Sequence, residues 1–185
     1  MLSDKIWVTR KARIYTEQRL LNSNSISNFL IVWYSLILVF LTIWNLEYPN
    51  EYINIFLVFG SIALLIASTV VTSQKYLERS LAVRNCYVKL DELYSKVIIA
   101  EQKENVDQIQ ELKTEYSAII QNVENHSDYD YLCLRFSLRN NKKTTLPEFN
   151  WVNCLIYIFN KIWRYLITFL YFVLPFGLAY IWGLI

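Results

Sequence analysis

Few residues in this chain could do chemistry, and they do not form a familiar catalytic pattern. The single histidine, His126, stands close to Asp128 and Asp130, and these three side chains are the candidates for a metal site. Asn, Ser and Asp are also the usual residues at the start of a helix, and Asn125 and Ser127 complete that composition. We therefore expect a capping or surface role for this segment, and no metal.

Glycine and cysteine also argue against catalysis. The three glycines all lie in apolar runs, which excludes a glycine-rich phosphate loop: Gly60, Gly177 and Gly183. The three cysteines are odd in number, and their spacing suits neither zinc nor a disulfide framework: Cys86, Cys133 and Cys154. We predict buried, reduced thiols, no enzymatic activity and no cofactor.

Three long runs of the chain contain no charged residue, and these runs determine how the other segments are placed. They cover residues 29–46, 53–74 and 165–185. A helix of about 20 apolar residues crosses the hydrocarbon core of a bilayer and satisfies its own backbone there. We predict three spanning helices. Because no run holds a carboxylate, amine or imidazole in its middle, a proton relay or an ion-coupled transporter is disfavoured.

The distribution of lysine and arginine predicts the topology. Residues 1–28 and 75–89 are rich in basic side chains, whereas the link at 47–52 has none. By the positive-inside rule, the N-terminus and the central region are cytoplasmic. The predicted parts are an N-terminal cytosolic amphipathic helix at 1–28, a transmembrane hairpin at 29–74, a cytosolic helical region at 75–148, and an interfacial helix with a third transmembrane segment at 149–185.

The second run carries two faces of small side chains. One face suits close helix packing in lipid: Gly60, Ala63 and Ala67. The other is weakly polar: Ser61, Ser68 and Thr72, with Leu65. The polar face could line a pore, but both faces could equally serve packing, and small residues favour packing.

The central region predicts two helices. The second run is expected to continue without a break into a helix through Gln102, with a heptad-like seam: Val83, Tyr87, Leu90, Tyr94 and Val97. Asn105 resembles an N-cap for a helix at 106–123. The first of these helices is basic and the second acidic, which favours an antiparallel hairpin, although two separately solvated faces explain the charges equally well.

The remaining segments connect these helices. The polar residues at 22–25 predict a break before the first run, and a short helix is expected at 129–138. A basic patch at Arg135, Arg139, Lys142 and Lys143 predicts contact with anionic lipid headgroups, and a soluble phosphate-bearing ligand is the less favoured alternative. Residues 150–164 are amphipathic and predict a helix at the membrane interface, and Pro175 predicts a kink in the third run.

The spacing of the N-terminal two thirds resembles the SLATT proteins, which are two-transmembrane effector domains of bacterial conflict systems. The resemblance covers about residues 5–130 and is carried by these residues: Trp7, Thr9, Arg13, Glu17, Arg19 and Leu20, then Tyr76, Leu77, Tyr87, Leu90 and Tyr94, then Glu124, Asn125, His126 and Asp128. The third run, at 165–185, departs from the pattern.

This resemblance implies a pore-forming effector in anti-phage defence. It implies a partner that senses infection: a nucleotidyltransferase that makes a cyclic oligonucleotide, a SLOG protein, or a reverse transcriptase. It also implies that Trp7, Arg13, Glu17 and Arg19 form a family-like N-terminal element, with His126 and Asp128 in an element after the cytosolic hairpin.

The resulting prediction is an all-α integral membrane protein of the bacterial inner membrane. A transmembrane hairpin continues into a cytosolic hairpin, and the chain forms a homo-oligomer that depolarises the membrane on a signal. The alternative is a non-enzymatic anchor or scaffold that localises a partner through its cytosolic helices.

Overall fold

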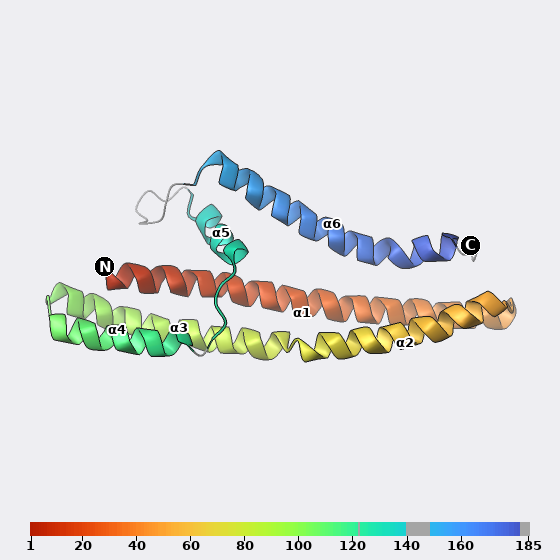
Figure 1. The fold of residues 1–185 in the computed structure, drawn as a ribbon, viewed down its shortest axis with the longest axis horizontal. Coiled ribbons are helices and arrows are strands. Elements are labelled where there is room, and N and C mark those ends of the chain that lie inside the picture. Colours follow the sequence, from red (N-terminus) through yellow and green to blue (C-terminus); the bar gives the residue numbers. More distant parts are fainter. Residues whose placement is uncertain (122, 140–148, 182–185) are drawn as a thin grey trace. The chain divides into compact units, whose positions relative to one another are not determined.

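The structure is a computed structural model that describes residues 1–121, 123–139 and 149–181. These residues form six α-helices (Figure 1), which are α1 (Leu2–Glu47), α2 (Glu51–Ser73), α3 (Tyr76–Gln102), α4 (Val106–Gln121), α5 (Asp128–Ser137) and α6 (Trp151–Ile181). The described part of the chain contains no strand, so the all-helical prediction is confirmed for it. The chain divides into two compact units, which are Met1–Leu21 with Tyr76–Phe159, and Asn22–Lys75 with Asn160–Ile185.

In the first unit, α3 and α4 pack against each other as a helical hairpin. The turn between them contains Glu104 in the left-handed region, with φ 51°. The Asn105 side chain accepts a hydrogen bond from the backbone N–H of Gln108 at 3.1 Å, so the predicted N-cap is confirmed. An ion pair joins the two helices, with 3.5 Å between Lys96 Nζ and Glu115 Oε1.

The core of this unit lies where α1, α3 and α4 meet. It is a cluster of buried side chains from the three helices: Ile6, Cys86, Leu90, Leu93, Val97, Ala100, Leu112 and Tyr116. Of the predicted seam, Val83, Leu90 and Val97 are fully buried, whereas Tyr87 and Tyr94 are only half-buried. At these two places the buried residue is the one before the tyrosine, so Cys86 and Leu93 lie in the interior.

Two predicted helix boundaries are wrong. No break occurs at 22–25, because α1 continues as one helix from Leu2 to Glu47. Asn and Ser favour helix ends because their side chains compete for nearby backbone groups, but here the helix continues through them into the apolar run. Conversely, the predicted uninterrupted helix from the second run is interrupted at Gln74 and Lys75, where Lys75 has φ 50°.

The second unit contains the apolar parts of α1 and α2. Among the described residues, two helical segments are long and apolar enough to cross a membrane: Leu2–Glu47 and Glu51–Gln102, which joins α2 and α3. Their apolar side chains face outward, with Phe40 63% and Leu65 67% exposed. An outward apolar surface of this kind is the one that lipid covers, whereas a soluble protein buries it. Residues 182–185 of the third predicted run lie outside the described residues, as do Lys142 and Lys143 of the basic patch.

The turn between α1 and α2 is built from asparagines. Asn50 caps α2 by accepting a hydrogen bond from the Tyr52 N–H at 2.9 Å. Asn45 Oδ1 accepts from the Asn50 N–H at 2.8 Å, and its amide donates to Asn54 at 2.6 Å. These bonds satisfy backbone groups that a helix end leaves open. Farther along α2, a Cβ added at Gly60 would lie 2.9 Å from the side chain of Leu38, so α1 and α2 approach closely there.

The second half of α6 packs against α1 within this unit. The rings of Trp33 and Phe172 stack at 4.4 Å between centroids. Pro175 lies inside α6 and has no N–H for the carbonyl of Tyr171, four residues earlier. The Tyr34 hydroxyl donates to that carbonyl at 2.7 Å, so α1 supplies the hydrogen bond that the proline removes.

Replacing Tyr34 with Phe removes this donor and leaves the Tyr171 carbonyl without a partner in an apolar environment. We expect the free energy of unfolding to fall by about 1–3 kcal/mol, because the bond is exposed in the single chain and the apolar part of a detergent or lipid offers the carbonyl no other donor. Thermal unfolding of purified Tyr34→Phe protein in detergent measures the change. Tyr48→Phe, at the α1–α2 turn, is the matched control, and an equal loss in both variants would contradict this role of Tyr34.

Candidate functional site

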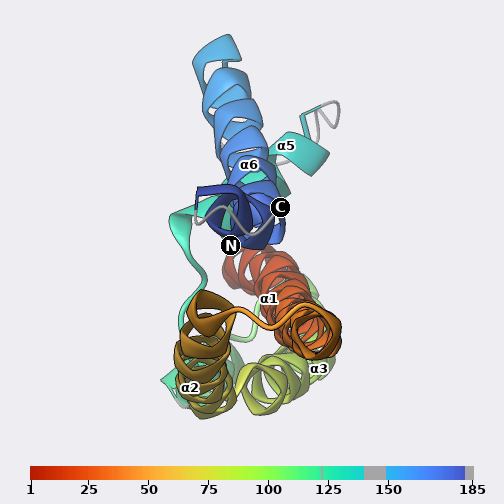
Figure 2. The ribbon, with the colours of Figure 1, turned by 90° about the vertical axis from the view of Figure 1, so that its right-hand side faces the viewer.

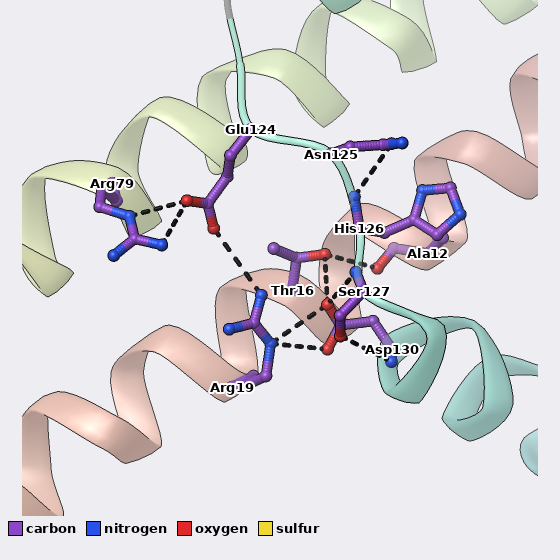
Figure 3. A network of polar contacts seen from close by, with 9 residues as sticks. All are labelled: Ala12, Thr16, Arg19, Arg79, Glu124, Asn125, His126, Ser127 and Asp130. Atoms are coloured by element: carbon purple, nitrogen blue, oxygen red, sulfur yellow. Dashed lines mark hydrogen bonds and ion pairs between the residues drawn. The ribbon is translucent and has the colours of Figure 1, made fainter.

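A polar network in the first unit joins α1 to the segment before α5, and we call it the clasp. Its members are Thr16, Arg19, Arg79, Glu124, Ser127 and Asp130 (Figure 3). The local sequence builds its centre, because Ser127 and Asp130 form a capping box at the start of α5. Asp130 N–H donates to Ser127 Oγ at 3.2 Å, and Ser127 N–H donates back to Asp130 Oδ2 at 2.9 Å.

Asp130 is the buried acceptor of the clasp and is only 1% exposed. From α1, Arg19 Nε donates to both carboxylate oxygens, at 3.0 and 3.2 Å, and Thr16 Oγ1 donates to Oδ2 at 3.1 Å. Burial alone raises the pKa of Asp130, but the hydrogen bonds from Arg19 and Ser127 outweigh it and hold the pKa below its usual 3.8. Asp130 is therefore a carboxylate at neutral pH, paired with Arg19.

Glu124 extends the clasp to the start of α3. Its Oε2 accepts from Arg79 Nε at 2.7 Å, and its Oε1 lies 3.8 Å from Arg19 Nη2. Arg79 stands four residues after Lys75, where the helical path from α2 is interrupted. The clasp thus connects α1, the beginning of α3 and the start of α5 through alternating charges.

Arg13 lies one turn before the clasp on α1, and its guanidinium is incompletely hydrogen-bonded. The residue is 2% exposed, yet Nε and Nη1 of its guanidinium have no acceptor among the described residues. His126 and Cys86 are close enough for its charge to shift their titration. Nδ1 of His126 is also buried and lacks a partner in the described part of the chain.

The charge of Arg13 affects the pKa of His126, and this effect can be measured. Burial lowers the pKa of His126 first, and Arg13 lowers it further, against the opposing effect of Asp130 and Asp128. We expect Arg13→Met to raise the pKa of His126 toward its usual 6.5. Because the chain has one histidine, its ring proton signals followed by NMR against pH give this value directly. An unchanged or lowered pKa would show that Arg13 does not face the ring.

The other end of α1 is also fastened to α3. The Glu101 carboxylate accepts from Leu2 N–H at 2.8 Å, and its second oxygen accepts from the Ser3 hydroxyl at 2.6 Å. Arg10 forms an ion pair with Asp91. Contacts near Ser3, Arg10 and Arg19 therefore hold the first five turns of α1 in place.

The predicted site residues fall into separate places. Arg13, Arg19 and His126 come together around the clasp. Burial raises the pKa of the Tyr87 hydroxyl, and the nearby Glu17 raises it further. Trp7 lies farther up α1, beneath Lys11. The hydroxyls of the polar α2 face bond to their own helix, to the carbonyls of Val58, Leu65 and Ser68: Ser61, Ser68 and Thr72.

Comparison with known protein families matches residues 1–181 to SMODS and SLOG-associating 2TM effector domain family 5, SLATT family 5. The chain belongs to this family. The match includes α6, so the third apolar run lies within the family pattern and does not depart from it, contrary to the sequence-based expectation. Curated proteins and solved structures give no match.

Membership of SLATT family 5 and two helices of spanning length both indicate a membrane protein. The family description names effector domains associated with SMODS and SLOG proteins, so a membrane effector in a conflict system is the activity that the family indicates. Among the described residues, no group of three His, Cys, Asp or Glu side chains could hold a metal ion.

Sequence reasoning missed the contacts at the centre of the clasp. The segment with His126, Asp128 and Asp130 was expected to cap a helix or lie at the surface, and the capping box of Ser127 and Asp130 confirms the capping role. The contacts of Asp130 with Thr16 and Arg19 were not predicted. One signal was available, because Ser127 followed three residues later by an acid is a capping box. Nothing in the sequence placed that box against α1, since 111 positions separate Arg19 from Asp130.

Proposed function

We propose that this SLATT protein is a pore-forming effector of the bacterial inner membrane in an anti-phage system. In this proposal the first unit is cytoplasmic, α1 and α2 cross the bilayer, and several copies assemble around a pore. A sensor partner or a nucleotide signal acts on the first unit and causes depolarisation. The family match and the two apolar helices support this assignment.

The observation that carries the proposal is the continuity of α1. A single helix holds the clasp residues Thr16 and Arg19 and continues through the apolar run to Glu47. A displacement of the clasp therefore acts on a helix that also enters the membrane. Two packings that differ by a few kcal/mol suffice for a switch, and a ligand shifts them by its differential affinity. In the proposal, the closed clasp holds the pore shut.

The polar face of α2 supplies the pore lining in this proposal. Ser61 and Thr72 are exposed in the single chain, and their hydroxyls already bond within the helix. We expect the triple variant Ser61→Leu, Ser68→Leu and Thr72→Leu to reduce the conductance about tenfold or more. The reason is that an apolar constriction expels water from the pore and so blocks ions. The control replaces Ala63 and Ala67 with Leu on the other face. Equal depolarisation by the two variants would contradict a pore lined by Ser61, Ser68 and Thr72.

Infection of cells that express the chain with its genomic neighbours tests the proposed function. A potential-sensitive dye should report depolarisation before lysis in cells with the complete system. Cells that die with an unchanged membrane potential would contradict a pore.

The alternative is a membrane anchor that localises a partner through the first unit, and the many exposed positions of α3 and α4 favour it. A scaffold tolerates replacement of α2 and the apolar half of α1 by unrelated spanning helices. We expect such a chimera to lose protection against infection while it still reaches the membrane. Full protection by the chimera would favour the anchor.

A further inference from the structure

The first part of α6 turns its polar side toward the protein and its apolar side outward. Within the first unit this part runs from Trp151 to Phe159. Its half-buried positions carry a polar side chain or a thiol: Asn153, Cys154 and Tyr157. Its exposed positions carry large apolar side chains, which we call the outer face of α6: Trp151, Val152, Leu155, Ile156, Ile158 and Phe159. A helix at the surface of a soluble protein has the opposite arrangement, so the outer face suits an apolar environment.

Aromatic contacts with α5 fix this orientation of α6. The rings of Phe136 on α5 and Tyr157 on α6 stack at 4.1 Å between centroids. Phe149, just before α6, meets Phe136 edge-on at 5.7 Å. The side of α6 that carries Tyr157 therefore faces α5, which leaves Trp151 74% and Phe159 66% exposed.

The chain around the outer face is strongly basic. From residue 131 to the end, the charged residues are Arg135, Arg139, Lys142, Lys143, Lys161 and Arg164, with Glu148 as the acidic one. The exposed Arg139 lies beside the start of α6, since its guanidinium is 4.2 Å from the ring centroid of Phe136. A second copy of the chain would bring the same positive charge to this face, and like charges oppose such a contact. Anionic lipid headgroups are attracted instead.

The helix continues from the outer face into the second unit without a break. There it lies beside α1 (Figures 1 and 2), where the ring of Phe172 contacts Phe29 and Trp33, and Phe176 also contacts Trp33. Residue numbers rise in the same direction along both helices, so α6 enters the second unit from the same side as α1.

The length of α6 places part of it outside the hydrocarbon. Its 31 residues make a helix about 46 Å long, whereas the hydrocarbon core is about 30 Å thick. Even at a tilt of about 40°, the largest usual one, such a helix extends beyond the core. The basic residues lie toward its first part, and basic residues mark the cytoplasmic side.

We propose that the outer face of α6 lies between the headgroups and the acyl chains of the cytoplasmic leaflet, with anionic lipid as its partner. Amphipathic helices with Trp, Phe and Leu on the apolar side bind at this depth. Because α5 packs on the other side of α6 and also carries Asp130, lipid at the outer face holds the clasp at the membrane surface. The proposal rests on the membrane location in the proposed function but not on a pore.

Spin labels on the full chain in vesicles of phosphatidylcholine and phosphatidylglycerol test this placement. Cys133 and Cys154 are replaced with Ala, and the buried Cys86 is kept. One label is then attached at Leu155→Cys or, in a second variant, at Ile158→Cys. Oxygen concentrates in lipid and a nickel chelate stays in water, so the collision rates of a label with these two reagents show which of them surrounds it.

Two further positions calibrate the measurement. Phe40→Cys carries the label on the exposed apolar run of α1 and reports insertion of the chain. Val106→Cys carries it at the start of α4, where the side chain is exposed, and reports water. We expect the labels at Leu155 and Ile158 to collide mainly with oxygen, as the label at Phe40 does, and the label at Val106 to collide mainly with nickel.

The lipid charge is tested with the label at Leu155. Arg139→Gln should lower the ratio of lipid-facing to water-facing label about fivefold, the factor that one basic residue near an anionic surface contributes. Lys103→Gln, which removes an exposed charge from the α3–α4 turn, should leave the ratio unchanged. Equal ratios in all three proteins would overturn anionic lipid as the partner.

The accessibilities separate the other occupants of the outer face. Labels at Leu155 and Ile158 that collide mainly with nickel would show that water covers the face. Labels that collide with neither reagent would show that protein covers it. Either result overturns the proposal, and the proposed membrane location survives if the label at Phe40 is in lipid. A label at Phe40 that lies in water would overturn both.

Discussion

Replacing Asp130 with Asn should lower the free energy of unfolding of the first unit by about 3 kcal/mol. The substitution keeps the shape of the side chain but removes the charge that pairs with Arg19, and breaking a buried ion pair costs roughly 3–5 kcal/mol. The lower end applies because Arg19 is 23% exposed and keeps some solvation. Denaturant unfolding of the purified full chain, followed by circular dichroism, measures the difference.

The loss of stability in Asp130→Asn should also depend on pH. The pKa of Asp130 is lowered in the folded protein, so its contribution to stability is fully present above the unfolded pKa, declines below that pKa, and is lost as the pH falls through the lower folded pKa. The difference between wild type and Asp130→Asn should therefore be full at pH 7 and shrink below about pH 4. Asp128→Asn, two residues away, is the control and should unfold as the wild type does. A wild-type-like Asp130→Asn at pH 7 would refute the clasp.

Replacing Arg13 with Met should have the opposite sign and raise the free energy of unfolding by about 1–4 kcal/mol. Apolar side chains of similar volume in place of buried charges have this effect, because the desolvation penalty is removed. Met also fits an irregular space better than a branched side chain. The same unfolding experiment should show that the two substitutions change the free energy of unfolding in opposite directions: Asp130→Asn lowers it and Arg13→Met raises it.

The control for Arg13→Met is Arg10→Met, which lies one turn earlier on α1 and loses its ion pair with Asp91. That variant should be no more stable than the wild type. A destabilised Arg13→Met would mean that the guanidinium is a structural group with acceptors of its own. A stabilised variant that no longer protects cells would show that Arg13 is kept for function.

The helices of this fold could be read from the sequence because their causes are local. Uncharged runs predict spanning helices, and the cap at Asn105 and the acidic-basic pairing of α3 and α4 follow from residues close in the chain. Of the five residues of the predicted seam, Val83, Leu90 and Val97 are buried. Tyr87 and Tyr94 were assigned to the predicted seam only because they lie at its heptad spacing.

The clasp could not be predicted, because its partners lie far apart in the sequence. Arg19 and Asp130 meet only after α1 has packed beside α3 and α4. The interruption at Lys75 was equally hidden, since a lysine with a positive φ has no sequence signature of the kind that glycine gives. The continuity of α1 over Asn22 was missed because short polar residues suit both helix ends and exposed helix surfaces.

The most direct test of the central claim uses the purified chain and lipid alone. Full-length protein is reconstituted into vesicles that carry an imposed potassium diffusion potential, and a potential-sensitive dye follows its decay. If the clasp on α1 controls a pore formed by the spanning helices, wild-type vesicles hold the potential. Asp130→Asn vesicles should then lose it about tenfold faster, since each 1.4 kcal/mol of bias changes a population by that factor. Equal retention of the potential by wild-type, Asp128→Asn and Asp130→Asn vesicles, with each protein shown to be inserted and helical, would contradict it.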